Sequence, residues 1–464
     1  MSASPCDLSR SASSDHTMVA RSASPSDLTM VARVASPPSR TRPATYALLV
    51  TLLGLALAVS GAPSPLYATY AREWHLSPLT LTVVFAVYAF AALAALLIAG
   101  SLTDAFGRKP ALLLSAVGMI VGLIILMTAH NVTALIVARA LHGAAIGTAV
   151  VAGGAAMLDI RPHAAARAGR LTGITFSVGM GLGLLGSAVL ADFAPGPLIT
   201  PYLVMGILVA LVLVGLAVAP ETHGARDSTR LRVARPSVPG AITADFRFAA
   251  LGAMASWVVL GVYLSLFPKL AADETGIHHL VFGGGVVAAL SLAAAATQWL
   301  AGGMDARRMA VTGDAGMAVA LLLSIPMVLS GNAVLVFASS ILLGVFFGMA
   351  FSGSLRHLSH VIPASHRGGV MSSFYILNYL AMAVPALLAG AAATRWSLPS
   401  TYAWFVAAVA LVCAAAAHLG RRTRFAQPTP VATPVATPVA DDVRQQERRA
   451  AGARAEPQTS ATSR

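Results

Sequence analysis

Two groups of polar residues could do chemistry in this chain, and apolar sequence surrounds both. The stretch GSLTDAFGRKP, residues 100–110, places an acid, two cations and two glycines in one short connector. Arg139 and His142 lie three residues apart inside an apolar run, so on a helix their side chains project to one side. A buried arginine can bind an anion, and an imidazole with an ordinary pKa of about 6.5 can take up and release a proton. The alternatives are an Arg139 side chain that extends outward to the membrane surface and a His142 that is only hydrogen-bonded.

The composition predicts that these residues belong to a membrane protein. The chain is 57% hydrophobic and 11% charged, whereas soluble proteins are roughly 45–50% apolar and about 25% charged. A helix needs about 20 apolar residues to cross a bilayer. Twelve runs approach that length: 46–67, 80–101, 111–128, 132–158, 171–190, 198–219, 248–267, 280–302, 316–329, 333–355, 370–394 and 401–419. The ninth run is short and follows Asp314, but the charge distribution requires it. We therefore expect an all-α integral membrane protein with twelve transmembrane helices.

Lysine and arginine residues predict how these spans are oriented. If the N-terminus is cytoplasmic, the inner loops carry fourteen such residues and the outer loops three, which are Arg72, Lys269 and Arg395. Short cytoplasmic loops are enriched in Lys and Arg. We therefore expect a multi-pass protein of the bacterial cytoplasmic (inner) membrane with both termini in the cytoplasm. The net charge of +13 then reflects topology and attraction to anionic lipid, and we expect no nucleic-acid partner.

Internal repeats divide the spans into two halves. Asp104 in AGSLTDAFGRK has a counterpart at Asp305 in AGGMDARR, and Pro162 in RPHAAARAG has one at Pro363 in IPASHRGG; both separations are 201 residues. Such repetition predicts two pseudo-symmetric six-helix halves with a substrate site between them near the membrane midplane. The expected segments are a disordered cytoplasmic tail (1–43), an N-terminal half (44–220), a cytoplasmic linker (221–247), a C-terminal half (248–420) and a second disordered cytoplasmic tail (421–464). The repeated leader leaves Met1, Met18 and Met30 as alternative starts.

The connector at 100–110 resembles the signature loop of the major facilitator superfamily. PET at 220–222 and RALHG at 139–143 also resemble motifs of that family, with His142 where the family often has Gln. The resemblance covers about residues 44–420 and implies a twelve-helix secondary transporter of an efflux-like type. It also implies a conformational latch between the halves on the cytoplasmic side, formed by Gly100, Asp104, Gly107, Arg108 and Lys109. Physically, the Asp104 carboxylate could meet the positive end of a neighbouring helix. The alternative is a basic loop that only obeys the charge rule.

Glycines in two spans predict close helix packing. GMGLGLLG in the fifth span contains glycines at dinucleotide-fingerprint spacing, but that fingerprint needs a preceding strand, so we reject it. Small residues every four positions, such as Gly179 with Gly183 and Gly143 with Gly147, instead allow helices to approach closely. The segment also resembles the fifth-helix motif of the family's antiporters. Met180 and Leu184 replace a proline and a glycine of that motif, so antiport is suggested only in part.

The interiors of the predicted spans lack acidic residues, because Asp192 and Asp314 fall at span ends. A site for cationic drugs would need a buried carboxylate, so we expect neutral, zwitterionic or anionic substrates. Pro63 and Pro65 should bend the outer end of the first span. His357 and His360 are interpreted as loop histidines, and no metal site is expected. Seven polar or aromatic residues could line a cavity or simply pack: Tyr88, Trp257, Tyr263, Gln298, Tyr375, Asn378 and Tyr379.

These patterns favour a secondary transporter, with proton-driven export of small organic molecules as the leading hypothesis. Uptake of a metabolite such as an organic acid or sugar is the alternative within the same class. A membrane enzyme would need a cluster of catalytic residues that the sequence lacks, and a non-transporting receptor or scaffold is the more distant alternative. The expected partners are a small-molecule substrate and the lipid bilayer, with the chain as a monomer. No cofactor is expected beyond a proton gradient.

Overall fold

The computed structural model describes residues 41–161, 165–222 and 235–422. Within these ranges the chain is helical and contains no strand, and twelve helices are long and apolar enough to cross a membrane. The predicted class, an all-α integral membrane protein with twelve spans, is confirmed. The predicted tails and start sites lie outside the described residues, except for 41–43 and 421–422, which continue the first and last helices. Residues 223–234 of the predicted linker also lie outside them.

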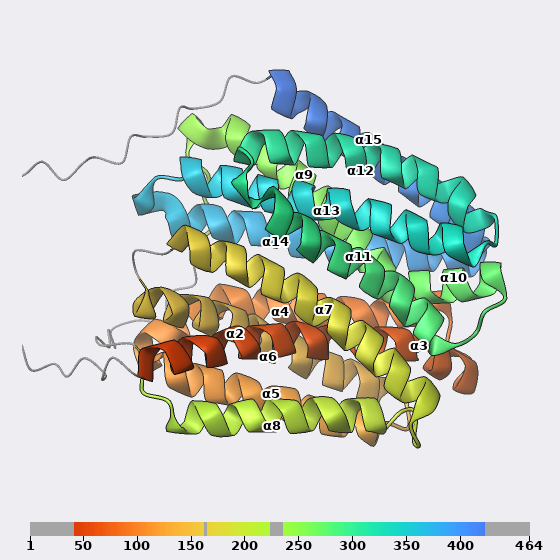
Figure 1. Ribbon diagram of the computed structural model, residues 1–464, viewed down its shortest axis with the longest axis horizontal. Coiled ribbons are helices and arrows are strands. Elements are labelled where there is room, and N and C mark those ends of the chain that lie inside the picture. The colour runs from red at the N-terminus through yellow and green to blue at the C-terminus, as the bar shows by residue number, and fades with distance from the viewer. Residues whose placement is uncertain (1–40, 162–164, 223–234, 423–464) are drawn as a thin grey trace, which may run out of the picture.

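The helices form two groups of six spans (Figure 1). The first group is α2 (Thr41–Gly61), α3 (Pro63–Glu73), α4 (Pro78–Phe106), α5 (Arg108–Met127), α6 (Val132–Ile160), α7 (Ala165–Phe193) and α8 (Thr200–Val218). The second is α9 (Thr243–Ser265), α10 (Phe267–Thr275), α11 (Leu280–Leu300), α12 (Ala306–Leu329), α13 (Ala333–Val361), α14 (Arg367–Arg395) and α15 (Leu398–Arg422). In each group the first span is broken into two helices, α2 with α3 and α9 with α10. Short 3₁₀ turns occur at Gly240–Ile242, Ala301–Gly303 and Ala364–His366.

The even number of spans brings the start of α2 and the end of α15 to one end of the bundle, at the left in Figure 1. We call this the terminal end; it also carries the connection between α4 and α5. The other end is called the opposite end. On the outer surface of α8, the side chains of Leu211, Val214 and Val218 are each more than half exposed. An apolar surface of this kind suits a lipid environment.

Side-chain caps fix where several spans begin. The side-chain oxygen of Asn131 accepts a hydrogen bond from Ala134 N (2.9 Å) at the start of α6, and that of Asn332 accepts one from Val334 N (2.9 Å) at the start of α13. Such caps satisfy backbone N–H groups that the first helical turn leaves free. The cap at Asn131 sets the start of α6, and thereby places Arg139 about two turns into the helix.

Prolines break the first span of each half at the opposite end. The predicted bend at Pro63 is confirmed as a break between α2, which ends at Gly61, and α3, which begins at Pro63. In the second half, Pro268 has no N–H group with which to close the helix onto the Leu264 carbonyl. The hydroxyl of Ser64 in the first half donates to that carbonyl at 2.6 Å, and this bond is buried. Pro268 thus leaves the Leu264 carbonyl without a partner in its own helix, and Ser64 of the other half donates to it.

Three expectations about boundaries are wrong. Helix α12 begins at Ala306, so Asp314 lies inside it and is buried rather than at a span end. Helix α9 begins at Thr243, so Asp245 lies in its first turn and not in a linker. His357 and His360 lie on α13 rather than in a loop, and His357 Nε2 is 2.9 Å from Asp245 Oδ1. Hydropathy ends a span at a charged residue, whereas a helix can continue through a charge that is buried among its neighbours.

Glycines allow close approach within the first half. A Cβ atom at Gly143 would clash with the Tyr88 carbonyl oxygen of α4, and one at Gly147 would lie 2.7 Å from the Ala92 carbonyl oxygen, about one turn further along α4. A Cβ at Gly179 or Gly183 would clash with the α2 backbone. These pairs bring α6 against α4 and α7 against α2, as close small-residue packing requires.

The two halves meet through α4 with α14 and through α7 with α11. At the opposite end, Leu79 N of α4 donates to Thr394 Oγ1 of α14 at 3.3 Å. There too, Val281 N in the first turn of α11 donates to Asp192 Oδ2 of α7 at 2.8 Å. A carboxylate at a helix N-terminus is stabilised by the unpaired N–H groups there. These polar contacts hold the halves together at the opposite end.

Candidate functional site

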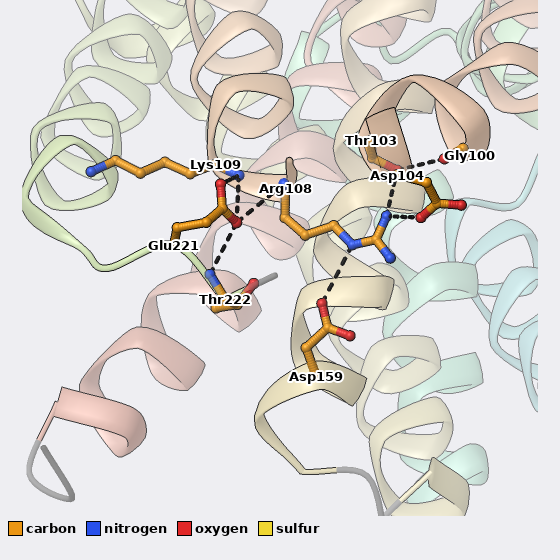
Figure 2. Close-up of polar contacts among 8 residues, drawn as sticks. All are labelled: Gly100, Thr103, Asp104, Arg108, Lys109, Asp159, Glu221 and Thr222. Carbon is orange, nitrogen blue, oxygen red and sulfur yellow. Dashed lines mark hydrogen bonds and ion pairs between the residues drawn. The ribbon is translucent and has the colours of Figure 1, made fainter. Parts of the chain in front are cut away.

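Helix α5 begins immediately after Gly107, and the carboxylate of Glu221 lies against its first turn (Figure 2). Glu221 Oε1 accepts from Arg108 N at 3.2 Å, and Oε2 accepts from Lys109 N at 3.1 Å. Gly107 has φ 100°, which favours glycine, and a Cβ there would lie 2.7 Å from Glu221 Oε2. Gly107 therefore makes the turn and leaves room for the carboxylate that caps α5.

Lys109 completes a reciprocal contact with α8. Its Nζ donates to the carbonyl oxygens of Ala217 (2.7 Å) and Ala219 (2.8 Å), where α8 ends. A cation suits the C-terminal end of a helix as an anion suits the N-terminal end. Glu221, which follows α8, caps the start of α5, and Lys109 of α5 caps the end of α8; we call this reciprocal arrangement the double cap. It ties the ends of two helices of the same half, so in this conformation Lys109 acts within the first half.

Arg108 connects the loop to the end of α6 (Figure 2). Its guanidinium donates to the Asp104 carboxylate, to Thr103 Oγ1 (2.7 Å) and to Asp159 Oδ2 (3.4 Å). The Asp104 side chain is 58% exposed, and its contact among the described residues is with Arg108. An added Cβ at Gly100 would meet open space. The latch between the halves expected of Asp104 is not made in this conformation and stays a prediction for another one.

Arg139 is buried between helices of the first half. Its side chain is almost fully enclosed, Nη1 donates to the Ser60 carbonyl at 3.1 Å, and Cζ lies 4.3 Å from the centre of the Tyr88 ring. The face of an aromatic ring attracts a cation, and Ser60 lies next to the break after Gly61. The side chain therefore turns into the bundle, and extension to the membrane surface is not observed.

Arg139 has a hydrogen-bond donor, Nε, that is not used by any described residue in this conformation. Its Nε and the hydroxyl of Tyr67 are buried and have no hydrogen-bond partner among the described residues. Tyr67 and Tyr88 both lie within electrostatic range of the guanidinium. Buried polar groups normally have partners, because an unpaired one costs free energy. Arg139 Nε and the Tyr67 hydroxyl are each a donor that could bind an anionic or polar group of a ligand.

His142 points to a different neighbour from Arg139. Its Nε2 lies 3.2 Å from the Met119 carbonyl oxygen of α5, and a Cβ at Gly122 would clash with the imidazole. Nδ1 is buried without a partner in the described structure. Arg139 and His142 lie within electrostatic range of each other but contact different helices, because Arg139 contacts α2 and α4 whereas His142 contacts α5.

Three of the candidate cavity residues lie together between the halves. Trp257 of α9 meets Tyr379 of α14 edge to face, with ring centroids 4.8 Å apart. Tyr379 lies within electrostatic range of Tyr88 of α4, which itself packs on Arg139. The structure thus places an aromatic group from the second half beside the Arg139 site.

The other four candidates have different surroundings. Gln298 of α11 donates to Ser177 Oγ of α7 at 3.1 Å and so joins the halves. Tyr263 stacks on a phenylalanine ring 3.9 Å away inside the second half, and Tyr375 meets one edge to face at 5.8 Å. Asn378 is buried, and neither atom of its amide has a partner among the described residues.

Sequence reasoning missed the roles of Glu221 and of the pair Asp245 and His357. Glu221 lies two residues after Ala219, where the predicted sixth span ends, and that position could have suggested a helix-end contact. Asp245 and His357 are 112 residues apart, and nothing in either local sequence indicates the pairing. Tertiary packing alone brings them together.

Comparison with known proteins places the chain in a family. The sequence profile of the Major Facilitator Superfamily matches residues 48–304 and 248–451. A solved bacterial homologue of the human lysosomal transporter Spinster, inward-facing and occupied, is 14% identical with a TM-score of 0.65, covering 85% of this chain and 100% of that one. The nucleoside transporter NupG, in a mutant form, is 10% identical with a TM-score of 0.63, covering 81% and 99%. At these identities the likeness shows the fold alone, and no curated protein matches in sequence. Because the profile covers more than half of the chain, the chain belongs to the Major Facilitator Superfamily and is a transporter.

Proposed function

We propose that this transporter exports small organic molecules in exchange for protons, and that its substrates are neutral, zwitterionic or anionic. The observation that carries the proposal is the buried Arg139, whose Nε is unpaired in the described structure and which lies within electrostatic range of Tyr67, whose hydroxyl is also unpaired there. A charge inside a membrane span is costly and is typical of substrate or ion sites. A planar guanidinium with free N–H groups suits a carboxylate or phosphate.

The surroundings of Arg139 disfavour a cationic substrate. The groups around it are the Ser60 carbonyl, the rings of Tyr67 and Tyr88, and the neutral or cationic His142. None of them is acidic, so a cation would meet the positive charge of Arg139 without a counter-charge. The buried Asp314 does not change this, because the helices that enclose it belong to the second half. Trp257 and Tyr379 supply an apolar wall for the rest of the substrate.

We place the terminal end in the cytoplasm of a bacterial cell and the chain in the cytoplasmic membrane as a monomer. Support comes from the distribution of Lys and Arg, which gathers in the connections at the terminal end. With that orientation, the contacts of Leu79 with Thr394 and of Asp192 with Val281 close the external end in this conformation.

The test is a panel of labelled organic anions, zwitterions and neutral molecules in proteoliposomes with an imposed pH gradient. Movement of substrate against the direction of the proton supports export, whereas movement with the proton indicates the alternative, uptake of a metabolite. Arg139→Ala should insert normally and lose transport, and Arg139→Lys should recover little because it lacks the planar fork. The matched control is Arg72→Ala, which removes an exposed arginine from the end of α3. Transport at the wild-type rate in Arg139→Ala would remove the basis of the proposal.

A further inference from the structure

Asp314 of α12 is a buried acid that neither the loop nor the Arg139 site uses. It lies in the third turn of α12, its exposure is 0%, and neither carboxyl oxygen has a hydrogen-bond partner among the described residues. Helix α12 is one of the twelve helices able to span a membrane. An acidic side chain in such a helix is rare, and where it occurs it usually marks a pathway for an ion or a proton.

Four helices of the second half enclose the carboxyl group. A Cβ at Gly252 of α9 would lie 2.6 Å from Oδ1 and 2.7 Å from Oδ2, so only glycine leaves room for the acid there. The adjacent Gly313 packs against the backbone of Ala350 on α13. The buried thiol of Cys413 on α15 lies within electrostatic range. The acid therefore occupies a fully buried space that Gly252 leaves open for it.

No cation balances this carboxyl group in the described structure. Cys413 is the titratable group that faces it, and no charged group is found within electrostatic range. Two other titratable side chains on these helices are engaged elsewhere: Arg307 with the Gly420 carbonyl, and His357 with Asp245. An ionised carboxylate without a partner in such surroundings is far less stable than the neutral acid. Asp314 is therefore held as a neutral acid in this conformation.

Even as a neutral acid, a buried carboxyl group without hydrogen-bond partners destabilises the fold. A small apolar side chain would occupy the space without burying unpaired polar atoms. The carboxyl group therefore needs a role that depends on its oxygens. Because Gly252 places no side chain between the acid and the α9 backbone, a small movement of α9 away from α12 would admit water to the carboxyl group.

We propose that Asp314 is a proton-binding site in the second half, filled in this conformation and emptied in another. On release, the O–H bond of the acid breaks, the proton passes to a water molecule and a hydrated carboxylate remains. The link to substrate movement rests on the proposed function, whereas the binding of a proton by Asp314 does not.

Infrared spectroscopy of the full-length protein in lipid tests proton binding directly. At neutral pH the wild type should show the stretching band of a buried protonated carboxyl group, and the band should disappear as the pH is raised. Asp314→Asn should lack the band. The matched control Asp273→Asn, which removes an exposed acid paired with Lys269, should keep it.

Three infrared results would overturn the proposal. One is the absence of the band in the wild type at neutral pH, and another is its persistence in Asp314→Asn, because either means that Asp314 is ionised. The third is a band that stays constant up to the pH at which the helices unfold, since the acid would then never release its proton. The wild-type titration decides the question even if Asp314→Asn fails to insert.

Transport measurements test the coupling. A gradient of one pH unit supports about a tenfold substrate ratio for each coupled proton. Asp314→Asn should keep substrate exchange at equal pH while that ratio falls to about one. A wild-type ratio in Asp314→Asn would refute coupling through this residue. If the wild type moved none of the panel, the proposed function would fail while the infrared result would stand.

Discussion

The double cap predicts that Glu221 stabilises the first half by holding α5 against α8. Its carboxylate accepts from the backbone N–H groups of Arg108, Lys109 and Thr222 at 3.0–3.2 Å. Glu221→Gln keeps an acceptor oxygen but removes the negative charge at the start of α5. Glu221→Ala removes every one of these contacts and leaves two N–H groups of the first turn without a partner.

The sizes of the two losses follow from these contacts. A charge at a helix terminus contributes about 0.3–1 kcal/mol when exposed and up to about 2 kcal/mol when partly buried. Glu221 is partly buried, so Glu221→Gln should lower the free energy of unfolding by about 1 kcal/mol. Hydrogen bonds to a charged group are each worth about 1.5–3 kcal/mol. Water replaces part of that in this site, so we expect Glu221→Ala to cost about 2–3 kcal/mol.

Thermal unfolding in detergent measures this effect. A domain of 150–250 residues, the size class of residues 41–222, loses about 2–4 °C of Tm per kcal/mol. Glu221→Ala should therefore lower Tm by about 5 °C or more, with Glu221→Gln between it and the wild type. Glu73→Ala, which removes an exposed acid at the end of α3, is the matched control. A Tm for Glu221→Ala equal to that of the control would refute the double cap as a stabilising contact.

Three further predictions concern packing, conformation and protonation. Gly183→Val should lower the yield of folded protein, because its side chain would clash with α2, whereas Gly186→Val on the same helix should not, since open space surrounds that position; fluorescence-detected size exclusion compares the two. Asp104→Asn should raise the labelling of cysteines introduced at the terminal end and lower it at the opposite end, if the acid joins the halves in the other conformation; unchanged labelling would leave the loop as a connector. His142→Gln should flatten the pH dependence of transport, and an unaltered profile would assign His142 to packing against α5.

The twelve spans could be predicted from the sequence because each crosses an apolar medium and must itself be apolar. Their limits could not, because hydropathy reports the solvent of a side chain and not the course of the backbone. Asp314 shows the difference most clearly. The predicted ninth run begins only after this acid, at residue 316, yet α12 begins at Ala306 and passes through Asp314, since Gly252 of α9 provides the space for its carboxyl group.

The sequence could predict which residues form the candidate site, but it could not predict which groups these residues contact. Arg139 stands out because one cation lies in an apolar run. Its partners are the Ser60 carbonyl and the Tyr88 ring, 79 and 51 residues earlier in the chain, and only the packing of three helices selects them. His142 follows the same logic, since spacing on α6 says which way it points but not that α5 lies there to receive it.

The bond between Ser64 and the Leu264 carbonyl has a consequence for the working cycle. Pro268 deprives that carbonyl of an internal partner in every conformation, so separation of the halves cannot return it to its own helix. When the opposite end opens, water can take the place of Ser64 at the carbonyl and also hydrate the released hydroxyl. One hydrogen bond is then exchanged for others of similar strength. Pro268 thus makes this closure reversible at little cost in free energy, because the Leu264 carbonyl keeps a hydrogen-bond partner in both states. The partner is the Ser64 hydroxyl when the end is closed and water when the end is open.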